Sequence, residues 1–367
     1  MSPAKVSQQE LSRITVLSIH DRIACFHSLK PFLFSREPRR FRFTDSPEWC
    51  LRKDRNDVLI MVRRFIKPDR VDLDLMRKLR GKYRRIAFFH DDAGGGIPRL
   101  DVLPFVDLFY TKALFRDRSL YAKPLYGKEL YSDFFHAKYG VVDPAPRQRP
   151  TESRPAELGK LRISWNIGIG DYPRGTQRQR AGVAVSIPFG FMAAKAFYGR
   201  GRLPMDPVAS NKGLYPVHAR LGLAGPPSIA HQRVLILEQI AGKPDFLVGS
   251  VSQRRFNHEV ANSRITLSPF GWGELCLRDF EAVRSGSLLL KPDMAHLETW
   301  PDIFVPSETY APFDWEGRSL VERARYWLAD EAARSRVARQ AYESYCDQLA
   351  GLDARFEAAM SEIGGGE

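Results

Sequence analysis

Residues 268–292 combine the residue types that phosphate and ribose binding require. They read SPFGWGELCLRDFEAVRSGSLLLKP and predict a glycine-bearing loop after an apolar strand, then a helix and a second apolar strand. A helix N-terminus offers free backbone N–H groups and the positive end of the helix dipole, and both favour a diphosphate. On this helix Arg278 can pair with phosphate oxygens, and Glu281, about one turn later, can accept hydrogen bonds from ribose hydroxyls. The pattern indicates a nucleotide-sugar site, and an ordinary strand–turn–helix with a solvated arginine and glutamate is the alternative.

The same stretch resembles the donor-binding motif of GT-B glycosyltransferases, in particular the exostosin-like group and related bacterial surface-polysaccharide transferases. That motif runs Ser-Pro, a glycine-rich loop, an arginine, Glu-Ala and then a glycine before a strand. The matching residues are Ser268, Pro269, Gly271, Trp272, Gly273, Arg278, Glu281, Ala282 and Gly286. The resemblance covers residues 264–306 and is only architectural elsewhere. It implies an α/β protein of the GT-B fold, in which two Rossmann-like domains face each other across a cleft and the second domain holds the donor.

Glu274 departs from the better-known pattern of retaining GT-B enzymes. Their two glutamates lie one position further apart than Glu274 and Glu281 do in this chain. Glu274 is therefore not carried over as the catalytic-side carboxylate, and it is kept as a donor-binding candidate together with the loop residues Gly271 and Gly273. Because the resemblance implies that phosphate charge is neutralised by side chains and a helix N-terminus, we expect no cofactor and no essential metal.

Three further donor-binding candidates rest on weaker patterns. Lys212 and Arg220, in SNKGLYPVHAR, lie before the donor helix and could supply a second phosphate contact, although plain loop charge explains them equally well. Gly168 follows an apolar strand and could let the backbone approach the sugar phosphate, although a glycine in that position is commonly a simple turn.

A compact acid–base cluster is formed by His90, Asp91 and Asp92, between Phe88-Phe89 and three glycines. An inverting glycosyl transfer needs a general base, and we take these three residues as the catalytic candidates. His90 titrates near neutral pH without help, whereas an aspartate needs burial or a neighbour to raise its pKa. A capped turn at a strand end is the structural alternative. Adjacent residues of a strand point to opposite faces, which argues against a metal site here.

The elements that position these residues read as two α/β halves. Strands are expected at Arg13–Ile19, Ile23–His27, Asp57–Arg63, Arg85–Phe89, Leu108–Thr111 and Leu120–Leu125, with a helix at Asp72–Leu79. The proline-rich stretch Asp143–Pro155 reads as a linker. We therefore expect an acceptor-side domain at 1–150, a donor domain at 156–345 and a C-terminal helix end and tail at 346–367. Helices are expected at Glu274–Arg284, Leu320–Ala329 and Glu331–Leu349, and the resemblance implies that the C-terminal helices pack back across the junction.

The net charge and the cysteine content of the chain indicate which kinds of molecule it could bind. The chain has 367 residues, with 56 Lys and Arg against 43 Asp and Glu, so that its net charge is +13. This charge favours anionic partners, namely nucleic acid, an anionic membrane or nucleotide diphosphates with acidic glycans. No zinc-finger or RNA-recognition pattern accompanies it, so we do not expect nucleic-acid binding. The 4 cysteines show no disulfide or metal spacing.

The N-terminal residues Met1–Gln9 are polar, and no apolar run approaches the ~20 residues of a spanning helix. We therefore expect a cytoplasmic protein, with at most peripheral contact with the inner face of the membrane. Its expected function is transfer of a sugar from a nucleoside diphosphate, with UDP favoured, to a glycan or lipid-linked glycan in surface polysaccharide synthesis, with inversion. The alternatives are a non-catalytic nucleotide-sugar or glycan-binding protein of the same fold and a basic nucleic-acid-binding protein.

Overall fold

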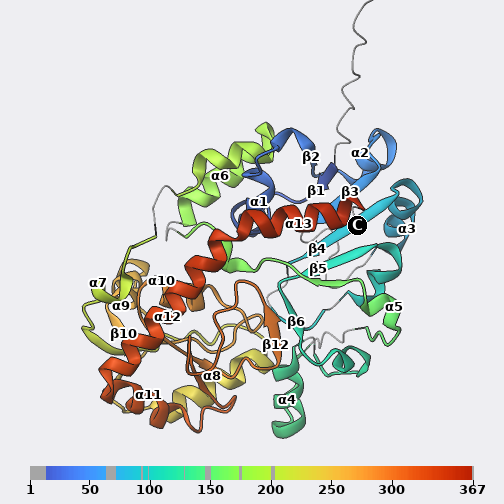
Figure 1. Ribbon diagram of the computed structural model, residues 1–367. Coiled ribbons are helices and arrows are strands. Elements are labelled where there is room, and N and C mark those ends of the chain that lie inside the picture. Colours follow the sequence, from blue (N-terminus) through green and yellow to red (C-terminus); the bar gives the residue numbers. More distant parts are fainter. Residues whose placement is uncertain are drawn as a thin grey trace, which may run out of the picture.

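Two parallel β-sheets, each covered by helices, form the protein (Figure 1). The computed structural model describes residues 14–62, 72–91, 94–97, 99–127, 129–144, 150–172, 176–199 and 203–365. Within these ranges one sheet has the order β2-β1-β3-β4-β5-β7 and the other β13-β11-β10-β8-β9. Every pairing within these two sheets is parallel. The expected α/β class with two Rossmann-like units is confirmed.

The strands of the first sheet are short, buried and rich in apolar residues, as expected for parallel strands covered on both faces. They are β1 (Ile14–Leu17), β2 (Phe41–Thr44), β3 (Val58–Val62), β4 (Arg85–His90), β5 (Leu108–Thr111) and β7 (Leu161–Ile163). The second sheet has the same character. Its strands are β8 (Tyr215–His218), β9 (Phe246–Leu247), β10 (Ser263–Leu267), β11 (Leu288–Pro292) and β13 (Ala311–Phe313).

Helices and helical turns connect the strands. Those of the first half are η1 (Ala24–Ser28), α1 (Lys30–Leu33), η2 (Pro38–Arg40), α2 (Pro47–Arg52), α3 (Leu73–Lys82), η3 (Leu100–Phe105), η4 (Arg118–Ala122), α4 (Leu130–Tyr139) and α5 (Pro155–Leu158). They continue with η5 (Ile167–Ile169), α6 (Thr176–Phe189), η6 (Phe191–Phe197), α7 (Pro207–Ser210), α8 (Pro227–Ile240), α9 (Gln253–Ala261), α10 (Leu277–Arg284), α11 (Leu320–Ala329), α12 (Glu331–Ala350) and α13 (Leu352–Gly364).

Two of the expected strands are wrong, because local caps start helical turns there. Asp21 precedes Ile23–His27, and its Oδ1 accepts a hydrogen bond from the Ala24 backbone N–H at 2.7 Å, so the segment turns into η1. Asp117 acts in the same way before Leu120–Leu125, where its side chain accepts from the Ser119 N–H and begins η4. An apolar run alone does not reveal such a cap.

One strand of the first sheet comes from the range expected for the donor domain, 156–345. Strand β7 lies within that range, yet it pairs with β5 and completes the edge of the first sheet. Beyond β7, η6 packs against α1 and η1 of the first domain. The first domain therefore extends through η6, and the strands of the second sheet begin only at β8.

The C-terminal helices join the two halves. Helix α12 packs on α10 and β11 of the second domain, whereas α13 packs on β4 and α1 of the first (red in Figure 1). The expected return of these helices across the junction is thus present in the structure.

The carboxyl ends of the two sheets meet at this junction. The segment after β5 forms β6 (Ala113–Phe115), and the segment after β11 forms β12 (Leu297–Thr299). These two short strands pair antiparallel with each other, one from each domain. Close by, the backbone N–H of Gly95 donates to Glu274 Oε2 at 3.2 Å. Ligands of open α/β sheets bind at carboxyl ends, so the junction is where a site is expected.

Candidate functional site

Arg278 lies at the carboxyl edge of the second sheet, in the first turn of α10. Its Nη2 donates to the Arg220 carbonyl oxygen at 3.0 Å, and its Cζ lies 5.6 Å from the ring centroid of Phe256. Its Nε is buried and has no hydrogen-bond partner among the described residues. Burial lowers the pKa of Arg278. A buried cation of this kind is costly unless an anion compensates it.

A second arginine, Arg233 of α8, is near enough for its charge to add to the effect of burial in lowering the pKa of Arg278. Its Nε donates to the Phe270 carbonyl at 3.2 Å, and its Nη1 donates to the Gly222 carbonyl at 2.6 Å. Arg233 therefore bridges the loop after β10 and the loop after β8. Within the described part of the chain, neither Arg233 nor Arg278 has a carboxylate within ion-pair distance. Two arginines held by carbonyl oxygens at one edge form a site suited to an anion with several oxygens.

The glycine loop turns tightly against this pair. The Gly271 N–H donates to the Gly273 carbonyl at 2.9 Å. A Cβ added at Gly271 would lie 3.4 Å from Arg233 Nη2 and 3.2 Å from Cys276 Sγ. The Tyr131 hydroxyl of α4 donates to the Gly271 carbonyl at 2.7 Å, which ties the loop to the other domain. A larger residue at position 271 would therefore crowd Cys276 and contact Arg233.

A buried ion pair supports the start of α10. Asp279 accepts from the Cys276 backbone N–H at 2.8 Å and from the Ser268 hydroxyl at 2.5 Å. Lys291 Nζ of β11 lies 3.0 Å from Asp279 Oδ1, and both side chains are completely buried. The Ser-Pro start of the sequence motif is therefore fastened to the N-terminus of α10, and this contact fixes the position of Arg278.

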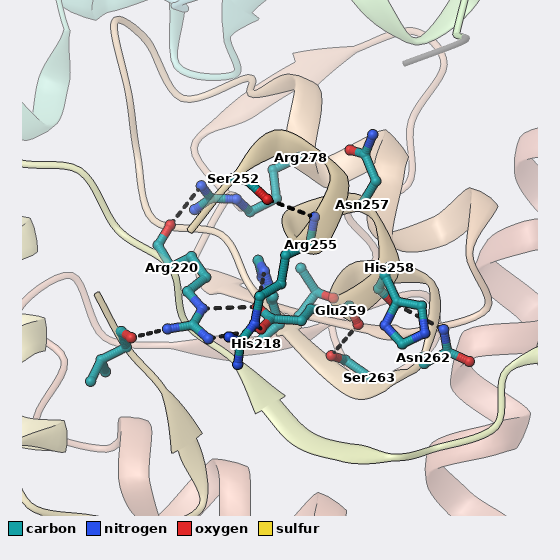
Figure 2. Close-up of polar contacts among 12 residues, drawn as sticks. His218, Arg220, Ser252, Arg255, Asn257, His258, Glu259, Asn262, Ser263 and Arg278 are labelled. Carbon is teal, nitrogen blue, oxygen red and sulfur yellow. Dashed lines mark hydrogen bonds and ion pairs between the residues drawn. The ribbon is translucent and has the colours of Figure 1, made fainter. Parts of the chain in front are cut away.

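Arg220 is held by a carboxylate. Its Nε donates to Oε2 of Glu259 and its Nη2 donates to Oε1, each at 2.8 Å, and Glu259 is fully buried on α9. Arg255 and His218 also lie within ion-pair distance of Glu259 (Figure 2). The guanidinium of Arg220, which was expected to contact phosphate, is thus bound to both oxygens of a carboxylate. Arg220 instead contributes its backbone carbonyl, which positions Arg278.

His218 gives this cluster an expected pH dependence. Burial, and then the charge of Arg278, lower its pKa from 6.5 to about 4. The unfolded chain therefore takes up a proton at higher pH than the folded protein does. The stability that neutral His218 provides is complete above pH 6.5 and is lost as the pH falls through about 4.

We expect the free energy of unfolding to fall by up to about 1.4 kcal/mol per pH unit for this one group across that window. Denaturant unfolding of wild type and His218→Gln at several pH values tests it, with exposed His258→Gln as the control. The variant should show the flatter profile, and equal slopes in all three proteins would contradict the assignment.

Glu281 and Gly168 lie on the side of α10 that faces the first domain. Glu281 is half-buried, and its charge helps to raise the pKa of Tyr172, after the larger effect of burial. The Gly168 carbonyl accepts from the Tyr345 hydroxyl at 2.6 Å, and a Cβ added there would lie 2.5 Å from the Phe280 ring. Gly168 thus serves the packing of η5 on α10.

Lys212 is separated from the other candidates. It precedes β8, so it lies at the amino edge of the second sheet, whereas Arg278 lies at the carboxyl edge. There it lines a small cavity with Arg264 and Arg334. The geometry does not bring Lys212 to the anion site, because the ends of a parallel strand are on opposite edges of the sheet.

Glu274 lies at the contact between the domains. Its fully buried carboxylate accepts from the Gly95 N–H through Oε2, and its Oε1 lies 3.4 Å from His296 Nε2. A Cβ added at Gly94 would lie 2.8 Å from Glu274 Oε2. The structure thus places Glu274 against the glycine loop that follows the acid–base cluster.

The acid–base cluster ends β4 of the first sheet. His90 is buried beside the rings of Phe88 and Phe109. Asp91 accepts from the Ser28 hydroxyl at 2.5 Å and lies 4.0 Å from Lys112 Nζ. Asp92 lies outside the described residues. No group of three potential metal-ligating side chains occurs within the ranges that the structure describes.

Arg233 is the member of the arginine pair that the sequence patterns missed. It lies six residues after Pro227, the first residue of α8, in a stretch that has no motif. The available signal was a Pro-Pro helix start soon after a strand at the edge where ligands bind.

Residues 216–355 match the family model described as glycosyl transferase-like. No curated protein matches the sequence.

Similar solved structures include an α,α-trehalose-phosphate synthase (UDP-forming) from Burkholderia vietnamiensis, with 11% identity and a TM-score of 0.46, covering 97% of this chain and 99% of that one. Anabaena Alr3699/HepE in complex with UDP has 10% identity and a TM-score of 0.43, covering 95% and 100%. An α-glucosyltransferase in complex with UDP has 10% identity and a TM-score of 0.40, covering 96% and 99%.

Proposed function

We propose that this protein is a glycosyltransferase that takes its sugar from a nucleoside diphosphate, with UDP as the carrier. The observation that carries the proposal is the pair Arg278 and Arg233, two cations without a carboxylate partner in the described residues, at the carboxyl edge of the second sheet. This edge belongs to the part of the chain that matches the glycosyl transferase-like family. UDP is the leaving group of the reaction, and two guanidinium groups would stabilise the charge that develops on its β-phosphate.

In the proposed reaction, an acceptor hydroxyl oxygen attacks the anomeric carbon of the donor sugar. The bond between that carbon and the β-phosphate oxygen breaks, UDP leaves, and a base takes the hydroxyl proton. We assign the base to the cluster at the end of β4, with His90 and Asp91 as its described members. The acid–base cluster and the anion site then lie on facing edges, since the loop after β4 contacts Glu274 of the second domain.

The acceptor that we propose is a glycan or a lipid-linked glycan of a surface polysaccharide, and inversion of the anomeric carbon is the proposed outcome. The support is the resemblance of residues 264–306 to exostosin-like and polysaccharide transferases. Glu281 is proposed to bind the ribose, because it follows Arg278 by three residues on the same helix.

Nucleotide binding is the direct test. We expect UDP to raise the thermal midpoint and to bind in calorimetry with a dissociation constant on the order of micromolar. Among UDP, GDP, CMP and dTDP, one nucleotide should bind selectively. Glu281→Ala should weaken that binding by about 10–100-fold, because it removes hydrogen bonds to a charged acceptor.

Glu322→Ala, an exposed glutamate on α11, is the matched control and should bind as wild type does. Absence of binding by a well-folded sample would overturn the proposal. Binding without turnover on any acceptor would favour a non-catalytic nucleotide-sugar-binding protein of the same fold.

A further inference from the structure

A helical hairpin of the first domain ends in an exposed apolar tip. Helix α6 and η6 pack closely against each other and are joined through Gly190, whose φ of +81° makes the reversal. Around this turn the side chains of Ile187, Phe189 and Met192 are 63%, 77% and 38% exposed. Together with Pro188 and Gly190 they form what we call the apolar tip, residues 187–190 and 192. Neighbouring exposed apolar residues of this kind mark an interaction surface.

The part of the hairpin below the tip packs tightly on residues 20–26 of the first domain. The buried ring of Phe191 stacks on His20 with a centroid distance of 3.9 Å. The Tyr198 hydroxyl donates to the Cys25 carbonyl at 2.6 Å. A Cβ added at Gly182 would lie 2.6 Å from the Phe26 ring, so α6 approaches η1 closely. Buried residues of the hairpin, such as Phe191 and Tyr198, thus belong to the core of the first domain, whereas the apolar tip lies outside that core.

The hairpin's own sequence carries charge of one sign, whereas exposed Asp45 of the neighbouring segment lies 3.8 Å from His20 Nε2. Residues 172–205 contain six Arg and Lys residues and no Asp or Glu. Among the described ones, Arg180 is exposed on α6. Lys195 Nζ lies 4.8 Å from the ring centroid of Phe34, which is itself 46% exposed. An apolar tip with a basic rim complements a surface that is apolar inside and anionic outside.

We propose that the apolar tip inserts into the interfacial layer of a bilayer that contains anionic lipid, while the basic residues of the hairpin contact the headgroups. No helix among the described ranges is long and apolar enough to cross a bilayer. The contact is therefore a docking at the surface. A protein partner with a mixed surface would leave the absence of acidic residues over this segment unexplained. This inference goes beyond the proposed function, and its test needs no donor.

Vesicle binding tests the proposal. We expect the full chain to co-sediment with vesicles of phosphatidylglycerol and phosphatidylcholine and to stay in solution with phosphatidylcholine alone. The double variant Ile187→Ser/Phe189→Ser should reduce the partition coefficient by about tenfold or more, since each side chain loses its transfer from water. Arg180→Gln should weaken binding at low salt and less so at high salt.

The control is Leu223→Ser, which replaces a 49% exposed apolar residue of the second domain and should bind as wild type does. Since all the replaced side chains are exposed, the thermal midpoints in buffer should agree. Phe189→Trp should be quenched by brominated lipid, whereas Leu223→Trp should not be.

Three outcomes overturn the proposal. The first is absence of binding to either vesicle, and the second is equal binding of wild type and the double variant, which would assign binding to the basic surface alone. The third is a lipid-free dimer in sedimentation velocity that the double variant abolishes, because the tip would then be covered by a second copy of the chain.

Discussion

Arg278→Met is expected to reduce kcat/KM for glycosyl transfer by about 100–1,000-fold, the loss found when one donor to a developing anion is removed. The nucleotide-free variant should at the same time be more stable than wild type. Arg278 is half-buried, its buried Nε has no hydrogen-bond partner, and it has no carboxylate partner in the described residues. Methionine therefore removes the cost of a poorly compensated charge. A stabilising change that abolishes activity is typical of a residue placed for function.

Two measurements separate this role from a structural one. Denaturant unfolding without nucleotide should give a higher midpoint for Arg278→Met, and calorimetry should show loss of nucleotide binding. Arg323→Met, an exposed arginine on α11, is the matched control and should change neither. A variant that loses stability and binding together would show that Arg278 only supports the fold.

Lys291→Met is expected to destabilise the protein by about 3–5 kcal/mol, because it leaves the carboxylate of Asp279 buried and unpaired. The loss should extend to the site. Asp279 holds both the Ser268 hydroxyl and the Cys276 N–H at the start of α10, so its displacement moves the turn that carries Arg278.

A double-mutant cycle with Asp279→Asn isolates this pair. The double variant should be less destabilised than the sum of the single variants, measured by chemical denaturation. Lys78→Met, an exposed helix lysine, controls for the loss of a positive charge. Additive single effects would mean that the two charges do not interact in the folded protein.

Much of the fold could be predicted from local pattern. The strand Leu108–Thr111 and the helix Leu320–Ala329 have the bounds that their apolar periodicity indicates. The order of glycines, Arg278 and Glu281 after a buried strand was enough to predict the sheet edge at which we propose the anion site, because a strand–loop–helix unit places such residues at the carboxyl edge wherever it occurs.

The partners of the site residues could not be predicted in this way. Sequence patterns offered both Arg220 and Arg278 as phosphate-binding candidates, yet Glu259 neutralises the first and no described carboxylate neutralises the second. Arg233 comes to the site from a helix without a motif. Lys212 lies far from the site because it precedes β8, and the amino and carboxyl ends of parallel strands are on opposite edges of the sheet.

Periodicity reports which face of an element is buried, so the sequence by itself determined the α/β class, most elements and the donor-side motif. It does not report which sheet a strand joins or which side chains meet across hundreds of residues. The tertiary structure alone therefore decided that β7 completes the first sheet, that α13 returns to it, and that Glu274 contacts Gly95. Those contacts are set by the packing of distant segments, and that packing also decides which cations stay free to bind a phosphate.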